Sequence, residues 1–193
     1  MQLQKSGIRV LGIAESCSSR EKSHLCGVVM RRDLHVDGFV FGTVTVGGDD
    51  ATKEILRMIR ELNRQDLNLI MLSGCVIAWY NIINPSEIHT STKIPVICVS
   101  YEESEGLVDH ILLHFPGDVD RVARYQNLGE RTQVALPTGY SLFARGWGLT
   151  EKEMTKACRL FTHHGKIPEP LRVARIAARS MTEYLRHETD AAI

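Results

Sequence analysis

The sequence lacks any long apolar run, any excess of charge and any close pair of cysteines. None of its apolar runs approaches the ~20 residues that a membrane-spanning helix needs, and its first residues, MQLQKSGIRV, contain no signal-peptide core. Lysine plus arginine and aspartate plus glutamate each number 23, whereas a domain that binds nucleic acid over its whole surface is usually basic. We therefore expect a cytoplasmic protein without membrane contact, in which any nucleic-acid binding depends on a local patch.

The cysteines are odd in number and widely spaced, at positions 17, 26, 75, 98 and 158. They form no C-x-x-C pair, which excludes the usual patterns of zinc and redox sites. Cys26, Cys75 and Cys98 lie inside apolar runs, where a free thiol behaves as a small hydrophobic side chain. The sequence therefore predicts buried thiols in a reducing compartment.

What the sequence does contain is typical of a packed globular domain. Hydrophobic residues make up 44% of the chain and charged residues 24%, and the length of 193 residues suits one domain. We find no internal repeat, low-complexity tract or linker. We therefore predict a single domain over residues 1–193, with its core between about residues 7 and 187.

Apolar patterning places strands first and helices last. The first three strands are predicted at 8–13, 25–32 and 35–46, and the short link RRDLH makes a hairpin of the second and third. Later segments are predicted as helices at 51–63, 84–92, 103–115, 117–129, 150–163 and 169–187, and as strands at 67–73, 93–100, 131–137 and 139–147. This order predicts an α/β fold whose mixed sheet has an antiparallel start, parallel inner strands and helices on both faces.

Three segments are expected to meet at the carboxyl ends of the parallel strands, where ligands collect in such sheets. They are the end of the first strand at Glu15, the loop before the first helix with Asp49 and Asp50, and the end of the fourth strand at Ser73. Acids at all three segments would hold Mg²⁺ or Mn²⁺ for two-metal phosphodiester chemistry. Asp50 also suits a helix N-cap, and Glu15 also suits a solvated turn.

A family resemblance rests on five stretches: RVLGIAES, VTVGGDDAT, MLSGCVIAWYNIINPSEIH, IPVICVS and IPEPLRVARIAA. In these stretches and in their order, the sequence resembles the archaeal family called domain of unknown function 99. That family is related to endonuclease V and has its ribonuclease H-like fold. The resemblance runs from about residue 7 to residue 187, and it implies a domain of the nuclease superfamily that acts on or binds DNA or RNA.

The resemblance also implies a degenerate acidic site. The family's first strand typically reads G-I-D-D-G, which aligns Ala14 and Glu15 with its two aspartates. Its loop before the helix reads V-D-G-x-D-A-T, so Gly47 replaces an acid and Asp50 is retained, and its fourth strand ends L-D-G, so Ser73 replaces another acid. Ala14 and Ser73 would then occupy two of three metal-ligand positions. Only Asp50, with the neighbouring Glu15, would remain to bind a metal, and would bind it weakly if at all.

The last predicted helix carries a stripe of arginines. At 100° per residue, Arg172, Arg175, Arg179 and Arg186 lie within an arc of about 60°, and such a stripe can contact the phosphates of a nucleic acid. Glu183 interrupts it, so an ordinary solvated face is the alternative.

Three functional hypotheses follow. The first is an endonuclease V-like domain that binds nucleic acid with weak or lost metal-dependent cleavage, and in which Ala14, Asp50 and Ser73 converge on one cleft. The second is an active Mg²⁺- or Mn²⁺-dependent endonuclease that uses Glu15, Asp49 and Asp50. The third is a non-catalytic interaction scaffold. The sequence leaves open whether DNA or RNA is bound, and in what oligomeric state.

Overall fold

The structure is a computed structural model that describes residues 7–17 and 21–191. Its strands are β1 Arg9–Cys17, β2 Lys22–Arg31, β3 Val36–Thr45, β4 Leu67–Ser73, β5 Val76–Ile77, β6 Asn81–Ile82, β7 Val96–Ser100, β8 Thr132–Ala135 and β9 Ser141–Trp147. Its helices are α1 Ala51–Leu62, α2 Pro85–Thr92, α3 Val108–His114, α4 Val119–Gln126, α5 Glu151–Phe161 and α6 Glu169–Ala191. No helix in these ranges is long and apolar enough to cross a membrane.

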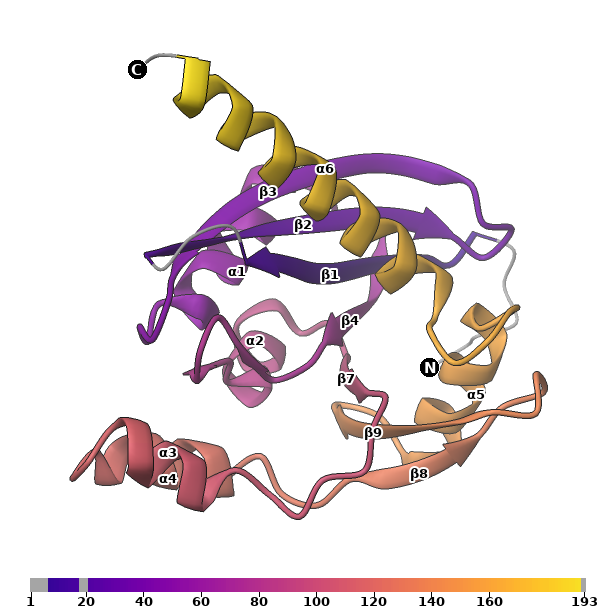
Figure 1. The fold of residues 1–193 in the computed structure, drawn as a ribbon. Helices are drawn as coiled ribbons and strands as arrows, with labels where there is room; N and C mark the ends of the chain where they lie inside the picture. The colour runs from indigo at the N-terminus through magenta and orange to yellow at the C-terminus, as the bar shows by residue number, and fades with distance from the viewer. Residues whose placement is uncertain (1–6, 18–20, 192–193) are drawn as a thin grey trace.

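Seven strands form one mixed sheet in the order β3-β2-β1-β4-β7-β9-β8 (Figure 1). The first three strands are antiparallel neighbours, β1, β4 and β7 run parallel, and β9 returns antiparallel to β7. The predicted mixed sheet, with its antiparallel start and parallel inner strands, is confirmed. The short strands β5 and β6 form a separate hairpin that the sequence did not predict.

The position of β4 inside the sheet explains why its sequence is apolar at nearly every residue instead of alternating. Ile70 and Leu72 point to the face covered by α1 and α2, whereas Leu69 and Met71 point to the face covered by α5 and α6. A parallel strand that is buried on both faces needs apolar side chains at every position. Helices therefore cover both faces of the sheet, as predicted.

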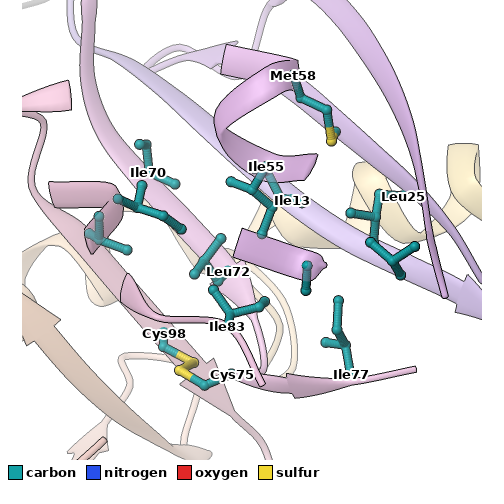
Figure 2. Close-up of a cluster of buried hydrophobic side chains, with 14 of the residues drawn as sticks. Ile13, Leu25, Ile55, Met58, Ile70, Leu72, Cys75, Ile77, Ile83 and Cys98 are labelled. Carbon is teal, nitrogen blue, oxygen red and sulfur yellow. A yellow bond between two sulfur atoms is a disulfide. The ribbon is translucent and has the colours of Figure 1, made fainter. Parts of the chain in front are cut away.

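α1 packs closely on the antiparallel strands. Its Ile55 and Met58 are fully buried in a cluster with Ile13 and Leu25 of the sheet (Figure 2). A Cβ atom at Gly42 of β3 would lie 2.7 Å from the sulfur of Met58, so this glycine allows the helix to approach the sheet.

α6 crosses the other face diagonally, over β1 and β2 (Figure 1). At Gly12 of β1 a Cβ atom would lie 2.5 Å from the Cβ of Pro170. Further along the contact, Ala14 of β1 packs against Ala174 and Ala178 of the helix. Small residues on both elements bring the helix close to the end of β1, where the candidate site lies.

The structure corrects one prediction about the cysteines. Cys75 and Cys98 are joined as a disulfide beside the α1 face (Figure 2), so the prediction of buried thiols at these two positions is wrong. Their Cα atoms lie 6.1 Å apart, because Cys75 lies two residues after the end of β4 and Cys98 belongs to the adjacent strand β7. Cys26 and Cys158 are buried free thiols, and burial raises the pKa of each to about 12.

Candidate functional site

Ala14 and Ser73 lie side by side at the carboxyl ends of two parallel strands. Ile13 of β1 pairs with Leu72 of β4, and Ala14 and Ser73 each follow one residue later. Because side chains alternate along a strand, both point to the face covered by α6. Ala14 is 3% exposed, so its methyl group belongs to the packed core beneath the helix.

Arg175 of α6 contacts Ser73 directly. Its Nη2 donates a hydrogen bond to Ser73 Oγ at 3.1 Å, and its Cζ lies 5.3 Å from the centre of the Tyr101 ring. The Tyr101 hydroxyl lies 3.4 Å from the same serine oxygen. Burial raises the pKa of Tyr101, which keeps its hydroxyl neutral. A guanidinium, a phenol and a hydroxyl therefore meet at the end of β4.

These three groups line a pocket of about 470 Å³ at the carboxyl ends of β4 and β7. Three more cationic side chains line it: Arg131, Arg145 and Lys166. The only carboxylates in the lining are Glu102 and Glu103. Four positive groups against two negative ones leave a net positive charge of two on a chain whose overall formal charge is zero. The pocket is therefore a local basic patch.

Three of the four cations of this pocket donate to backbone carbonyls. Arg131 donates to the carbonyl oxygens of Glu102 and Ser104, Arg145 to that of Gly129, and Lys166 to that of Tyr101. Lys166 also forms an ion pair with the carboxylate of Glu102. Burial lowers the pKa of Arg145, and the nearby charge of Arg131 lowers it further, although Tyr125 acts in the opposite direction. Like charges crowded in this way favour an anion between them.

Asp50 lies on the other face of the sheet, beside α1. Its carboxylate accepts hydrogen bonds from the backbone N–H and hydroxyl of Thr45 and from Nδ2 of Asn81. It occupies the predicted N-cap position of α1, but its side chain makes no capping bond. The fully buried Asn81 caps the helix instead, because its Oδ1 accepts from the backbone N–H of Ala51.

Glu15 also points away from Ala14 and Ser73. Its carboxylate accepts from the hydroxyl of Ser23 at 2.8 Å and from the backbone N–H of Ala78 at 3.0 and 3.1 Å. Ala78 belongs to the cluster on the α1 side of the sheet. Glu15 therefore fastens the turn between β5 and β6 to the sheet.

The remaining residues predicted from the loop lie apart from the pocket. Asp49 is 73% exposed at its side chain and lies 3.8 Å from Arg124 of α4. Gly47 packs against the rings of Phe115 and Trp79, which a Cβ atom there would approach to 3.3 and 3.8 Å.

The structure thus brings Ala14 and Ser73 together and directs Asp50 and Glu15 elsewhere. The predicted convergence of Ala14, Asp50 and Ser73 on one cleft does not occur. Ala14 and Ser73 face α6, whereas the carboxylate of Asp50 binds Thr45 and Asn81 on the α1 side of the sheet. Among the residues that the structure describes, no three histidine, cysteine, aspartate or glutamate side chains are placed to hold a metal ion. Ser73 already accepts a hydrogen bond from a cation. The donor groups at these strand ends therefore do not fit a divalent metal.

The three arginines predicted to bind nucleic acid differ in their surroundings. Arg175 lines the pocket, whereas Arg172 pairs with Glu169 and Arg179 pairs with Glu183. Sequence reasoning missed the pocket residues Tyr101, Arg131, Arg145 and Lys166. Tyr101 follows directly after a predicted parallel strand, so its position at the strand end was a usable signal. The other three come from segments whose position beside β7 no local pattern reveals.

Comparison with known proteins identifies the family. The model of the endonuclease dU family matches residues 6–182. The UPF0215 protein of Pyrobaculum calidifontis is 36% identical over 177 residues, which cover 91% of this chain and 97% of that protein.

Solved structures support the same fold. A protein of unknown function from Archaeoglobus fulgidus is 26% identical with a TM-score of 0.79, over 90% of this chain and 98% of that one. Endonuclease V of Ciona intestinalis, solved with a 24mer DNA that contains inosine, is 14% identical with a TM-score of 0.64, over 92% and 87%. The second likeness shows a shared endonuclease V-like fold. The family match and the relative together show that the chain belongs to the endonuclease dU family.

Proposed function

We propose that this protein binds nucleic acid through the cationic pocket at the ends of β4 and β7, and that it has lost metal-dependent cleavage at Ala14 and Ser73. The observation that carries the proposal is the hydrogen bond from Arg175 to Ser73. At this position the family resemblance expects a carboxylate that holds a metal. Here a hydroxyl holds a guanidinium instead, and that guanidinium is available to a phosphate.

The charge of the pocket supports a phosphate ligand. Arginine guanidinium groups match the oxygens of a phosphate through paired hydrogen bonds, and three of the four cations in the lining are arginines. Because the chain has no net charge, attraction to a polyanion must come from such a local patch. The endonuclease V of Ciona intestinalis, which shares the fold, was solved bound to DNA.

The test is oligonucleotide binding at increasing salt concentration, followed by the fluorescence anisotropy of a labelled strand. Each phosphate contact adds about 0.7 to 0.9 to the slope of log affinity against log salt concentration, because it releases counterions. We expect Arg175→Ala to weaken binding and to reduce the slope by about that amount. Arg172→Ala and Arg179→Ala are matched controls, since they remove the same charge from the same helix outside the pocket.

Two results would contradict the proposal. Equal slope changes in all three variants would mean that the arginine stripe of α6, rather than the pocket, contacts phosphates. Absence of salt-dependent binding by the unchanged protein, to single-stranded and to duplex DNA and RNA, would favour the interaction scaffold.

The family description favours a second candidate, an active endonuclease that cleaves at deoxyuridine. Its acids would be Glu15, Asp49 and Asp50. The assay is nicking of a deoxyuridine-containing oligonucleotide with Mg²⁺ or Mn²⁺, and the proposal expects none above a chelator control. Metal-dependent nicking that Glu15→Gln abolishes and Glu105→Gln preserves, with both variants folded, would establish the endonuclease instead. Glu105 is a suitable control because it is exposed and lies in the loop after β7.

A further inference from the structure

The turn between β5 and β6 holds an exposed tryptophan in a strained conformation. Ala78, Trp79 and Tyr80 have φ angles of 41°, 58° and 64°, so all three lie in the left-handed region that side chains other than glycine rarely adopt. Trp79 is 56% exposed at the tip of this turn. Three successive residues remain in such a conformation only where the surroundings hold them there.

The surroundings do hold this turn from three sides. Glu15 accepts from the N–H of Ala78, and the carbonyl of Ala78 accepts from the N–H of Gly47 at 2.7 Å. Arg121 of α4, whose side chain is 8% exposed, donates to the carbonyl of Tyr80 at 2.6 Å. Side chains and backbone from three distant segments therefore fix the position of Trp79.

Aromatic rings extend the surface that Trp79 presents. Its ring centre lies 4.7 Å from that of His114 at the end of α3, and 5.5 Å from that of Tyr80. Tyr80 in turn packs edge-on against Phe115, whose face carries the guanidinium of Arg121 at 4.0 Å. Trp79 and His114 thus form the outer part of a braced aromatic cluster.

This cluster lies close to the cationic pocket. Val76 of β5 lines the pocket three residues before Trp79, and Leu107 lines it at the start of α3. His114 lies at the other end of α3, whose seven residues rise by about 10 Å. The aromatic surface and the pocket are therefore separated by about the length of α3.

We propose that Trp79 and His114 form a stacking platform for an unpaired nucleobase of a strand whose phosphates occupy the cationic pocket. This inference rests on the proposed function. Aromatic side chains bind bases through their flat faces irrespective of sequence, commonly beside a positively charged groove that follows the backbone. The base must be unpaired, because the faces of a base inside a duplex are covered by its neighbours.

The first test uses tryptophan fluorescence. The chain has two tryptophans, so Trp147→Phe leaves Trp79 as the only one. We expect single-stranded oligothymidylate to quench this fluorescence on binding. An abasic strand of the same length, which carries the same phosphates without bases, should bind with the same salt dependence but leave the fluorescence unchanged.

The second test measures affinity. Trp79→Ala should weaken binding of the oligothymidylate by about fivefold to 150-fold, the range found for a stacked base, and should leave binding of the abasic strand unchanged. Trp79→Phe should keep part of the affinity. Tyr140→Ala is the control, because Tyr140 is 58% exposed on the turn before β9.

The outcomes separate this inference from the proposed function. Salt-dependent binding of both strands, with unchanged fluorescence and no effect of Trp79→Ala, would overturn the platform and leave the pocket intact. If neither strand bound, both proposals would fail. Should Trp79→Ala not fold, quenching in the Trp147→Phe protein and the affinity of Trp79→Phe decide the question.

Discussion

At the scale of single residues, the buried amide of Asn81 connects three segments of the chain. Its Oδ1 accepts from the N–H of Ala51 at 3.1 Å, and its Nδ2 donates to Asp50 at 2.7 Å and to the carbonyl of Thr45 at 3.0 Å. The start of α1 and the end of β3 are thereby fixed to β6. Asp50 takes part in this network as a hydrogen-bond acceptor, which gives its carboxylate a structural role.

We expect Asp50→Asn to lower the free energy of unfolding at neutral pH by about 1.5 kcal/mol, the lower end of the range for hydrogen bonds to a charged group, because Asp50 is partly exposed. Burial raises the pKa of Asp50, but hydrogen bonds from Thr45 and Asn81 outweigh it, so the pKa lies below its ordinary value of 3.8. The carboxylate therefore stabilises the fold above that value, and this contribution is lost as the pH falls through the lower, folded-state pKa.

Urea unfolding over a range of pH checks this prediction. The difference between the two proteins should shrink as the solution is acidified below pH 3.8, since the aspartate of the unchanged protein then becomes neutral as well. Asp49→Asn is the control, because its side chain is 73% exposed and a surface change of this kind alters stability by about 0.5 kcal/mol at most. A difference for Asp50→Asn that does not vary with pH would contradict a role for its charge.

For Asp50, the local sequence predicts the start of the helix but not the partners of the carboxylate. An aspartate before the apolar spacing of α1 correctly marked the first turn of the helix, because that signal lies within a few residues. The group that caps the helix is Asn81, which lies 31 residues away from Asp50 in the chain. No local pattern could have indicated that the carboxylate turns back to β3. The role of Asp50 therefore depends on Asn81, which is distant in the sequence.

At the scale of elements, α4 holds two loops of the candidate surface through one side chain. Arg121 pairs with Asp118 at 2.8 Å, and its other nitrogens donate to the carbonyls of Gly47, Gly48 and Tyr80. A buried guanidinium satisfies several carbonyls at once because its donors form a planar fork. α4 thereby fixes both the loop before α1 and the turn that carries Trp79.

Arg121→Met should therefore lower the free energy of unfolding by about 1.5–4.5 kcal/mol, because the carbonyls of Gly47, Gly48 and Tyr80 lose their donor at about 0.5–1.5 kcal/mol per hydrogen bond. The loss should be accompanied by faster amide hydrogen exchange at residues 78–81, where the turn loses its support. Urea unfolding and exchange measured by mass spectrometry check the two effects. Arg124→Met, one turn further along the helix at a site 41% exposed, is the control and should cost much less. Equal costs would show that Arg121 is not the specific support of these loops.

Most helices and strands were predictable because the apolar residues within each recur at the spacing typical of a helix or a buried strand. β4 was recognised by a continuous apolar run, and α1 by Ile55, Met58, Ile59 and Leu62 at helical spacing. The hairpin of β5 and β6 was missed, because its left-handed turn is built from Ala78, Trp79 and Tyr80 without the glycine or asparagine that usually marks one. That turn is held by tertiary contacts, which no local pattern contains.

At the scale of the whole molecule, the disulfide joins β7 to the segment that follows the neighbouring strand β4, beside the pocket. Cys75 lines the pocket and follows β4, and Cys98 lies in the middle of β7. The spacing of cysteines does not determine their pairing, and apolar flanks suggested free thiols. The pairing follows from the parallel alignment of β4 and β7, which places Ser73 opposite Val99.

The last prediction concerns this disulfide. The paired cysteines are 23 residues apart, and a cross-link of that size stabilises a fold by about 3 kcal/mol through the unfolded chain. Reduction should therefore lower the melting temperature by about 6–12 °C in a protein of this length. The double variant Cys75→Ala, Cys98→Ala should melt lower than the oxidised protein and should not respond to reductant. Thiol titration of the denatured, unreduced protein provides an independent check, because at most three of the five cysteines should react. Five reactive thiols, together with a melting temperature that reductant leaves unchanged, would contradict the pairing and restore the prediction of buried thiols at both positions.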